Sequence, residues 1–302
     1  MGMTQTFSLS QQMQNYQYEI EEALDRLLSL RECPQREGIE AMRYSLLGGG
    51  KRIRAILTLE FARAYGVPKE QAMPFGAAVE MVHAYSLIHD DLPCMDDDDY
   101  RRGKPSCHRQ FSEATAMLAG DGLLTHAFIA ALEGGLRAGV QPNRAAEAAL
   151  ILAQGAGIDG MLGGQIMDLA MEGKKVEAEL HQRMCAMKTG ALIRSACLMG
   201  CALGAAGPQD RKITEEYADK IGLSFQMIDD ILDCTGQQEL LGKPVGSDAQ
   251  QNKTTYVTLY GLERAKEMSQ RQTEEALECL ERLPLPDRFL AEFTEMLLAR
   301  KF

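Results

Sequence analysis

The chain has 302 residues, of which 45% are hydrophobic and 6% aromatic, with no Trp and a formal net charge of −11. No Pro/Gly/Ser-rich linker divides it, so we expect one domain over residues 1–302, with residues 1–10 as a flexible N-terminus. The acidic balance argues against a nucleic-acid-binding protein, because nucleic acid repels an acidic surface that lacks a large basic patch.

The cysteines and the apolar segments bear on the compartment. Eight cysteines are scattered without a C-x-x-C pair, which is typical of a reducing cytoplasm. The N-terminus lacks a basic region followed by an apolar stretch, and the longest apolar window, residues 191–207, contains Arg194 and several glycines. We therefore expect a cytoplasmic protein with no signal peptide and no membrane span.

Helical periodicity dominates the chain. Residues 11–30 carry apolar side chains at helical spacing, and the pattern recurs in nearly every long segment up to Lys301. Clusters of glycine and proline predict the loops, at residues 48–50, 66–68, 102–105, 139–142 and 207–208. Strand-like alternation is scarce and aromatic residues are few, so the sequence predicts an all-α fold.

A basic run follows the first glycine cluster, in the order Gly48-Gly49-Gly50-Lys51-Arg52-Ile53-Arg54. A glycine turn lets the backbone approach an anion closely, and the guanidinium of Arg54 can bind it through two N–H groups. The run is not a P-loop, because G-x-x-x-x-G-K-[S/T] is absent. It indicates either an anion-binding site or a basic surface patch.

The first acidic cluster has six aspartates between positions 90 and 99. A divalent cation would relieve their mutual repulsion. Asp90 and Asp96 are six residues apart and do not share a helix face, but Pro93 between them must kink or end a helix. The kink would swing Asp96 back toward Asp90 and Asp91, and these three aspartates form a candidate metal site.

Basic residues flank this cluster. His83 lies seven residues before the first aspartate, which on a continuous helix is nearly the same face. His89 suggests an HD-type phosphohydrolase, but that site would require further His and Asp ligands on other helices. An alternative interpretation is an acidic loop capped by Arg101 and Arg102, and residues 97–99 fit that description as solvated side chains.

A second acidic motif contains Asp229 and Asp233, four residues apart and therefore one turn apart on a helix. Mg²⁺ prefers oxygen ligands and often takes one or two carboxylates together with phosphate oxygens of a substrate. A solvated acidic helix face is the alternative. Two carboxylate sites on separate helices suggest Mg²⁺ ions holding one diphosphate from both sides, with Lys188, Lys243 and Lys253 as further cations.

Taken in order, these motifs resemble the trans-polyprenyl diphosphate synthase family, and within it the bacterial farnesyl diphosphate synthases. The matching segments, between about Tyr44 and Tyr260, are Gly49–Arg54, Asp90-Asp91-x4-Asp96, Arg101-Arg102-Gly103, Gly164-Gln165-x2-Asp168, Lys188-Thr189-Gly190, Asp229-Asp230-x2-Asp233, Lys243 and Lys253-Thr254-Thr255-Tyr256. The chain departs from the family at Ala55 and Val257, where proline is frequent. The resemblance implies a single large helical bundle of the isoprenoid synthase type with a central active-site cavity, and a homodimer.

The implied reaction is the Mg²⁺-dependent, head-to-tail condensation of isopentenyl diphosphate with dimethylallyl or geranyl diphosphate, as in a (2E,6E)-farnesyl diphosphate synthase or geranyltranstransferase. Three Mg²⁺ ions are implied, with Mn²⁺ as a substitute. The implied metal ligands are foremost Asp90, Asp96 and Asp229, with Asp91, Asp230 and Asp233 in or near the coordination shell. The implied binding residues are Arg101, Lys188 and Lys243 for the allylic diphosphate, Lys51, Arg54, His83 and Arg102 for isopentenyl diphosphate, and Lys253 for a substrate. The implied catalytic residues are Lys188, Thr189, Gln226, Asp90 and Asp229, with Thr189 and Gln226 facing the allyl group.

Tyr85 and Ser86 lie five and four residues before Asp90, where the resemblance places the floor of the product tunnel. A bulky Tyr85 beside a small Ser86 implies a C15 product. The alternatives are a geranyl or geranylgeranyl diphosphate synthase, a class I terpene cyclase, and a non-catalytic helical subunit. The basic run disfavours a cyclase, which has no second diphosphate to hold, and intact aspartates in both motifs disfavour a non-catalytic subunit.

Overall fold

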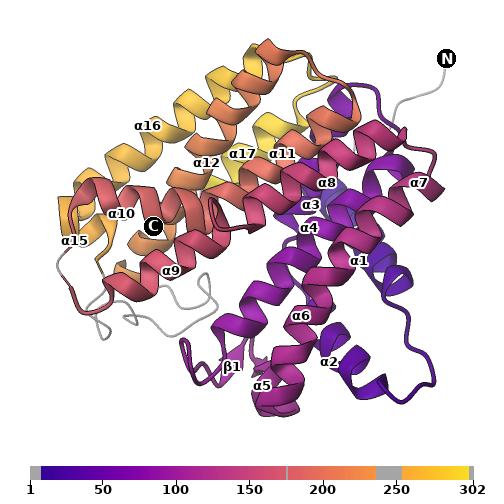
Figure 1. Ribbon diagram of the computed structural model, residues 1–302. Coiled ribbons are helices and arrows are strands. Elements are labelled where there is room, and N and C mark those ends of the chain that lie inside the picture. Colours follow the sequence, from indigo (N-terminus) through magenta and orange to yellow (C-terminus); the bar gives the residue numbers. More distant parts are fainter. Residues whose placement is uncertain (1–7, 175, 236–253, 299–302) are drawn as a thin grey trace.

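The computed structural model describes residues 8–174, 176–235 and 254–298 (Figure 1). The helices are α1 (Leu9–Leu27), α2 (Arg36–Leu46), α3 (Ile53–Ala64), α4 (Lys69–Asp90), α5 (Cys107–Gln110), α6 (Glu113–Ile129), η1 (Ala130–Gly134), α7 (Gly135–Arg137), α8 (Pro142–Ala156), α9 (Met161–Met171), α10 (Ala178–Cys185), η2 (Ala186–Gly190), α11 (Ala191–Leu203), α12 (Pro208–Thr235), α15 (Tyr256–Tyr260), α16 (Leu262–Glu281) and α17 (Phe289–Leu298). Two short strands, β1 (Tyr100–Arg101) and β2 (Lys104–Pro105), form an antiparallel hairpin. The predicted all-α fold is confirmed.

Local sequence explains where several helices begin. Ser8 caps α1 through a capping box with Gln11, and the Ser112 hydroxyl accepts a hydrogen bond from Thr115 N at the start of α6. Proline occupies the first position of α8, where its missing N–H costs no helical hydrogen bond. The loops predicted around residues 66–68, 139–142 and 207–208 all separate helices in the structure.

The core is built around α3, α4 and α11, which pack against one another. Residues 55–62 of α3 are buried without interruption, so this helix has no solvent-facing stripe and lies inside the molecule. Helix α6 packs on α4, and α8 packs on α11. The long helices α12 and α16 lie side by side, as Figure 1 shows. The helices surrounding α4 therefore hold its C-terminal end, where the first aspartate motif begins.

The structure differs in detail from the sequence expectations at the hairpin and at the N-terminus. The loop predicted at residues 102–105 includes a β-turn, because Arg102 and Gly103 both have positive φ (53° and 75°) and let strands β1 and β2 pair. The stretch Glu113–Arg137 is long and apolar enough to cross a membrane by length and composition alone. It packs against α2 and α4, and the expected absence of a membrane span stays a prediction. Helix α1 begins at Leu9, within the N-terminal segment that was expected to be flexible.

Candidate active site

The first aspartate motif lies where α4 ends. Helix α4 stops at Asp90, and the chain turns so that the backbone N–H of Asp96 donates to the carbonyl oxygen of Asp90 at 2.9 Å. The predicted return of Asp96 toward Asp90 is thus confirmed. The pKa of Asp90 is raised to about 6, chiefly because the carboxyl group is buried; the charge of Lys188 lowers this pKa, and the charges of Asp96 and Asp91 raise it. The site concentrates negative charge that a cation would stabilise.

Asp91 differs from its neighbour because an arginine already holds it. Its side chain is buried, and both carboxylate oxygens accept hydrogen bonds from Arg101 Nε, at 2.7 and 2.9 Å. Although burial opposes it, this pair raises the pKa of Arg101. Residues 97–99 are exposed, as expected. Asp91 therefore fixes the direction of Arg101 at the edge of the aspartate cluster.

The second motif lies on α12, as predicted, with Asp229 and Asp233 one turn apart. Asp230 between them is buried and has hydrogen bonds at both oxygens. Oδ1 accepts from Gln226 Nε2 at 2.9 Å, and Oδ2 accepts from Tyr256 N at 2.7 Å. Asp230 therefore connects α12 to the start of α15 and orients the amide of Gln226.

The π-helical turn η2 lies between the two motifs. Lys188 Nζ donates to Asp168 Oδ2 at 2.5 Å and also interacts electrostatically with Asp90. The next residue, Thr189, donates to Gln226 Oε1 at 3.2 Å. Two neighbouring residues thus face the first and the second motif respectively, an arrangement that a π-helical turn allows by changing the direction of successive side chains.

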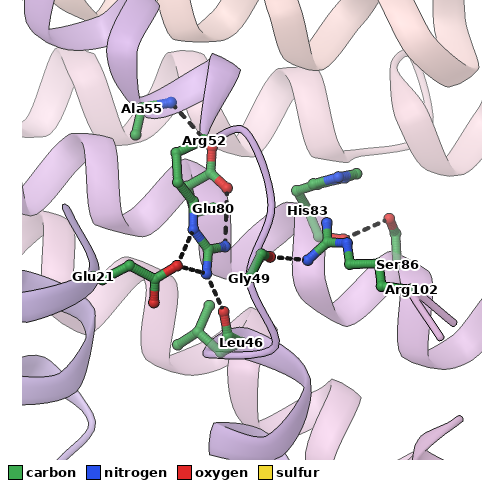
Figure 2. Close-up of polar contacts among 9 residues, drawn as sticks. All are labelled: Glu21, Leu46, Gly49, Arg52, Ala55, Glu80, His83, Ser86 and Arg102. Atoms are coloured by element: carbon green, nitrogen blue, oxygen red, sulfur yellow. Dashed lines mark hydrogen bonds and ion pairs between the residues drawn. The ribbon is translucent and has the colours of Figure 1, made fainter. Parts of the chain in front are cut away.

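A basic cluster lies beside the aspartates and is formed by α3, α4 and the hairpin turn. Arg102 donates to the carbonyl oxygen of Gly49, as Figure 2 shows. Burial lowers the pKa of His83 well below its ordinary value, and the charges of Arg54 and Arg102 lower it further. In the part of the chain that the structure describes, the buried Nε of Arg54 has no hydrogen-bond partner. Such a group is costly unless an anion binds it.

A cavity of about 310 Å³ lies between the basic cluster, the first aspartate motif and η2. Its lining includes Arg54, His83, Tyr85, Ser86, Asp90, Lys188 and Thr189. It also includes Gln165, whose two buried amide atoms have no hydrogen-bond partner within the described segments. Gln165 belongs to the Gly164-Gln165-x2-Asp168 motif, and the sequence predicts no role for it. A larger groove of about 720 Å³ lies against α1, α4 and η1, away from both aspartate motifs.

The carboxylates of the two aspartate motifs suit Mg²⁺. Carboxylate oxygens of Asp90, Asp96 and Asp229 are hard ligands of the type that this ion prefers. Among the described residues, no group of three or more His, Cys, Asp or Glu side chains is arranged as a metal site. Mg²⁺ often takes only one or two carboxylates and completes its shell with water and phosphate oxygens, so these aspartates fit it.

Three predicted cationic residues do not line the cavity within the described part of the chain. Lys51 is exposed at the end of the glycine turn that precedes α3. Lys243 and Lys253 lie outside the described residues. Of the predicted site residues, seven line the 310 Å³ cavity: Arg54, His83, Tyr85, Ser86, Asp90, Lys188 and Thr189. Arg101 and Arg102 are adjacent in sequence but contact different groups, because Arg101 contacts Asp91 and Arg102 contacts the glycine turn.

Comparisons with known proteins identify the family of this chain. Residues 36–283 match the polyprenyl synthetase family. The chain is 41% identical to the farnesyl diphosphate synthase of Geobacillus stearothermophilus, over 97% of this chain and 98% of the relative. It is 45% identical to a chloroplastic geranylgeranyl pyrophosphate synthase of Capsicum annuum, over 80% of this chain and 65% of the relative. The structure of an FPP/GFPP synthase from Zymomonas mobilis superposes with a TM-score of 0.87 at 35% identity, over 96% of this chain and 99% of that chain.

Proposed function

Because the chain belongs to the polyprenyl synthetase family, we propose that it condenses isopentenyl diphosphate with dimethylallyl or geranyl diphosphate, giving mainly farnesyl diphosphate and pyrophosphate. The observation that carries the proposal is that two separate cationic groups reach one cavity. Lys188 lines the cavity beside Asp90, with Arg101 held by Asp91. Arg54 lines the same cavity next to the charge of Arg102, which contacts the glycine turn. Two diphosphates require two such groups.

The proposed site assigns each residue a task. Lys188, Arg101 and Lys243 hold the allylic diphosphate, and Lys51, Arg54, His83 and Arg102 hold isopentenyl diphosphate, with Lys253 as a further substrate-binding residue. The metal ligands are foremost Asp90, Asp96 and Asp229, with Asp91, Asp230 and Asp233 in or near the shell. When bound, three Mg²⁺ ions, or Mn²⁺ in their place, neutralise charge on the diphosphate that leaves.

The reaction breaks the allylic C–O bond and forms one carbon–carbon bond. Lys188 and Arg101 stabilise the charge that develops on the departing pyrophosphate. Thr189 and Gln226 face the allylic cation in the proposed reaction. The Thr189 hydroxyl donates to Gln226 Oε1, and Asp230 accepts from Gln226 Nε2, so both contacts hold the Gln226 side chain. The alkene of isopentenyl diphosphate attacks the cation, and the released pyrophosphate takes the proton that the product loses. The apolar cavity wall keeps water from the cation.

A product assay tests the proposal. Purified protein incubated with isopentenyl and geranyl diphosphate should release pyrophosphate and form a C15 diphosphate in the presence of Mg²⁺. Adding EDTA should abolish both products, and excess Mg²⁺ should restore them. Absence of any prenyl product from C5, C10 and C15 allylic substrates would contradict the proposal. A C20 product would instead favour the geranylgeranyl alternative, which the similarity to the Capsicum annuum enzyme supports.

We also propose a homodimer and a cytoplasmic location. Leu118, Ile129, Leu132 and Leu136 are exposed along the apolar stretch Glu113–Arg137. Exposed apolar side chains gathered in this way are typical of an interface between subunits. All eight cysteines are outside disulfides, which supports a reducing compartment.

A further inference from the structure

The isopentenyl diphosphate site proposed above depends on a backbone segment with unusual geometry. Gly49 and Gly50 have positive φ, of 85° and 133°, and Arg52 has a φ of 52°. Left-handed backbone is ordinary for glycine but unfavourable for a bulky residue such as arginine. The conformation at Arg52 therefore requires support from its surroundings, and this conformation sets the direction in which α3 begins.

Two carboxylates from other helices provide that support, as Figure 2 shows. Arg52 is 4% exposed, and its Nε donates to Glu21 Oε1 of α1 at 2.8 Å. Its Nη1 lies 3.4 Å from Glu80 Oε2 of α4, and its Nη2 donates to the carbonyl oxygen of Leu46 at 2.7 Å. All three nitrogens of the guanidinium are therefore held by α1, α4 and the end of α2.

Glu80 has a second contact, which replaces a missing helix cap. Arg52 is the N-cap of α3 and provides no side-chain cap, since a guanidinium has no acceptor. Instead Glu80 Oε1 accepts a hydrogen bond from the backbone N–H of Ala55, at 3.1 Å. A carboxylate at this position also interacts favourably with the positive end of the helix dipole. Glu80 thus holds both Arg52 and the first turn of α3, which carries Arg54.

Glu80 also balances charge where several cations meet. Burial lowers the pKa values of Arg54 and Arg102, and the charge of Glu80 raises both. Without this carboxylate, the neighbouring guanidinium groups would repel one another before any diphosphate entered. His83, one turn after Glu80 on α4, lies next to the same cations. The carboxylate is thus buried behind the anion-binding side chains.

We propose that Glu80 and Glu21 are positioning residues that act through Arg52 to hold Arg54 and the glycine turn in the geometry that binds isopentenyl diphosphate, an inference that rests on the proposed function. Neither glutamate touches the substrate. Glu80 acts at the start of α3, and Glu21 makes the N-terminal helix α1 part of the support for this site.

Glu80→Gln tests the proposal, because the amide keeps the shape and removes the charge. Glu60→Gln is a matched control, because Glu60 is 2% exposed against 3% for Glu80 and pairs with Arg63. Glu60 lies on α3 about two turns after Ile53, the first residue of that helix. We expect Glu80→Gln to raise the KM for isopentenyl diphosphate about tenfold, while the KM for geranyl diphosphate changes less than about twofold. Glu60→Gln should lower the melting temperature and leave both KM values unchanged.

Glu21→Gln provides a second variant if Glu80→Gln fails to fold, because the Glu21 side chain is 33% exposed. It should raise the same KM by a smaller factor. Calorimetric titration of the unmodified protein and of each variant with isopentenyl diphosphate alone distinguishes failure of the proposed function from failure of the positioning role. Failure of the unmodified protein to bind it would overturn the proposed function and the positioning role with it. Tight binding by unmodified protein and by Glu80→Gln alike would overturn the positioning role alone.

Discussion

Asp91 and Asp230 are the second carboxylates of their motifs, and each is engaged by groups of the protein itself. Arg101 binds both oxygens of Asp91, while Gln226 and Tyr256 bind different oxygens of Asp230. A carboxylate engaged in this way is better suited to orienting its partners than to binding a cation alone. The two motifs therefore combine candidate metal ligands with orienting groups.

Asp230→Asn separates these two tasks. An asparagine has one acceptor oxygen, so its NH2 group must face one of the two donors that Asp230 now accepts. We expect kcat to fall at least about tenfold, with the Mg²⁺ concentration for half-maximal activity unchanged within about twofold. Asp229→Asn should raise that concentration instead. Equal shifts in Mg²⁺ dependence for the two variants would contradict the orienting role.

His83 should make stability depend on pH. Burial holds its pKa in the folded protein well below the value of about 6.5 in the unfolded chain. As pH falls through about 6.5, the unfolded state takes up a proton that the folded state does not, so the free energy of unfolding decreases. His83→Asn should therefore reduce the loss of melting temperature between about pH 7.5 and 5.5. The remaining slope has a contribution from His181, whose pKa burial also lowers.

Tyr85 and Ser86 should set the product length. Both line the cavity, and the hydroxyl of Ser86 donates to the carbonyl oxygen of His83. Tyr85→Ala would remove a bulky wall and lengthen the products, whereas Ser86→Phe would fill the cavity and shorten them to C10. Chromatography of the dephosphorylated products measures both effects. Identical product profiles for both variants and the unmodified protein would contradict the floor position of these residues.

At the scale of elements, the close approach of α9 to η2 controls the position of Lys188. A Cβ atom at Gly164 would lie 2.1 Å from the backbone nitrogen of Lys188. The backbones of α9 and η2 can therefore approach this closely only because residue 164 has no side chain. Gly164→Ala should destabilise the protein by about 1–3 kcal/mol and lower kcat by displacing Lys188. Thermal unfolding and steady-state kinetics measure the two effects.

Gly38→Ala is the matched control for that substitution. Gly38 is also helical, in α2, but has no atom within 4 Å of its added Cβ. Alanine in an open helical position should stabilise the protein by about 1 kcal/mol and leave kcat unchanged. Destabilisation by both substitutions would mean that contact with η2 is not the cause.

The sequence predicted most elements but not those set by long-range contacts. Helical spacing and glycine or proline clusters located most helices and loops, and Pro93 explained the turn that follows α4. The hairpin and the π-helical turn η2 were not predicted. A two-residue strand is too short to show an alternating pattern. A π-helical turn differs from an α-helix only in that each backbone hydrogen bond spans one more residue. Glu80 and Arg52 are 28 positions apart, so no local sequence pattern could predict that they pair.

At the scale of the whole molecule, the exposed face of the apolar stretch Glu113–Arg137 should determine the oligomeric state. Leu118 is 67% exposed on that face, and burying it against a second copy would remove apolar surface from water. Leu118→Glu should shift the protein from dimer to monomer in sedimentation velocity. Leu30→Glu, at a position 42% exposed outside this stretch, should leave the dimer intact. A monomeric unmodified protein would contradict the proposed homodimer.

The hairpin of β1 and β2 is a place where the chain should not tolerate inserted residues. Surface turns usually tolerate inserted residues, because lengthening a loop adds only a small entropic cost. This turn is different, because Arg101 and Arg102 enter it side by side and contact Asp91 and the glycine turn respectively. One residue inserted before Arg101 would turn the side chains that follow to the opposite face of the hairpin. Both arginines would then lose their partners. Designers of variants should therefore treat these few residues as fixed in number, although they lie in one of the more exposed parts of the chain.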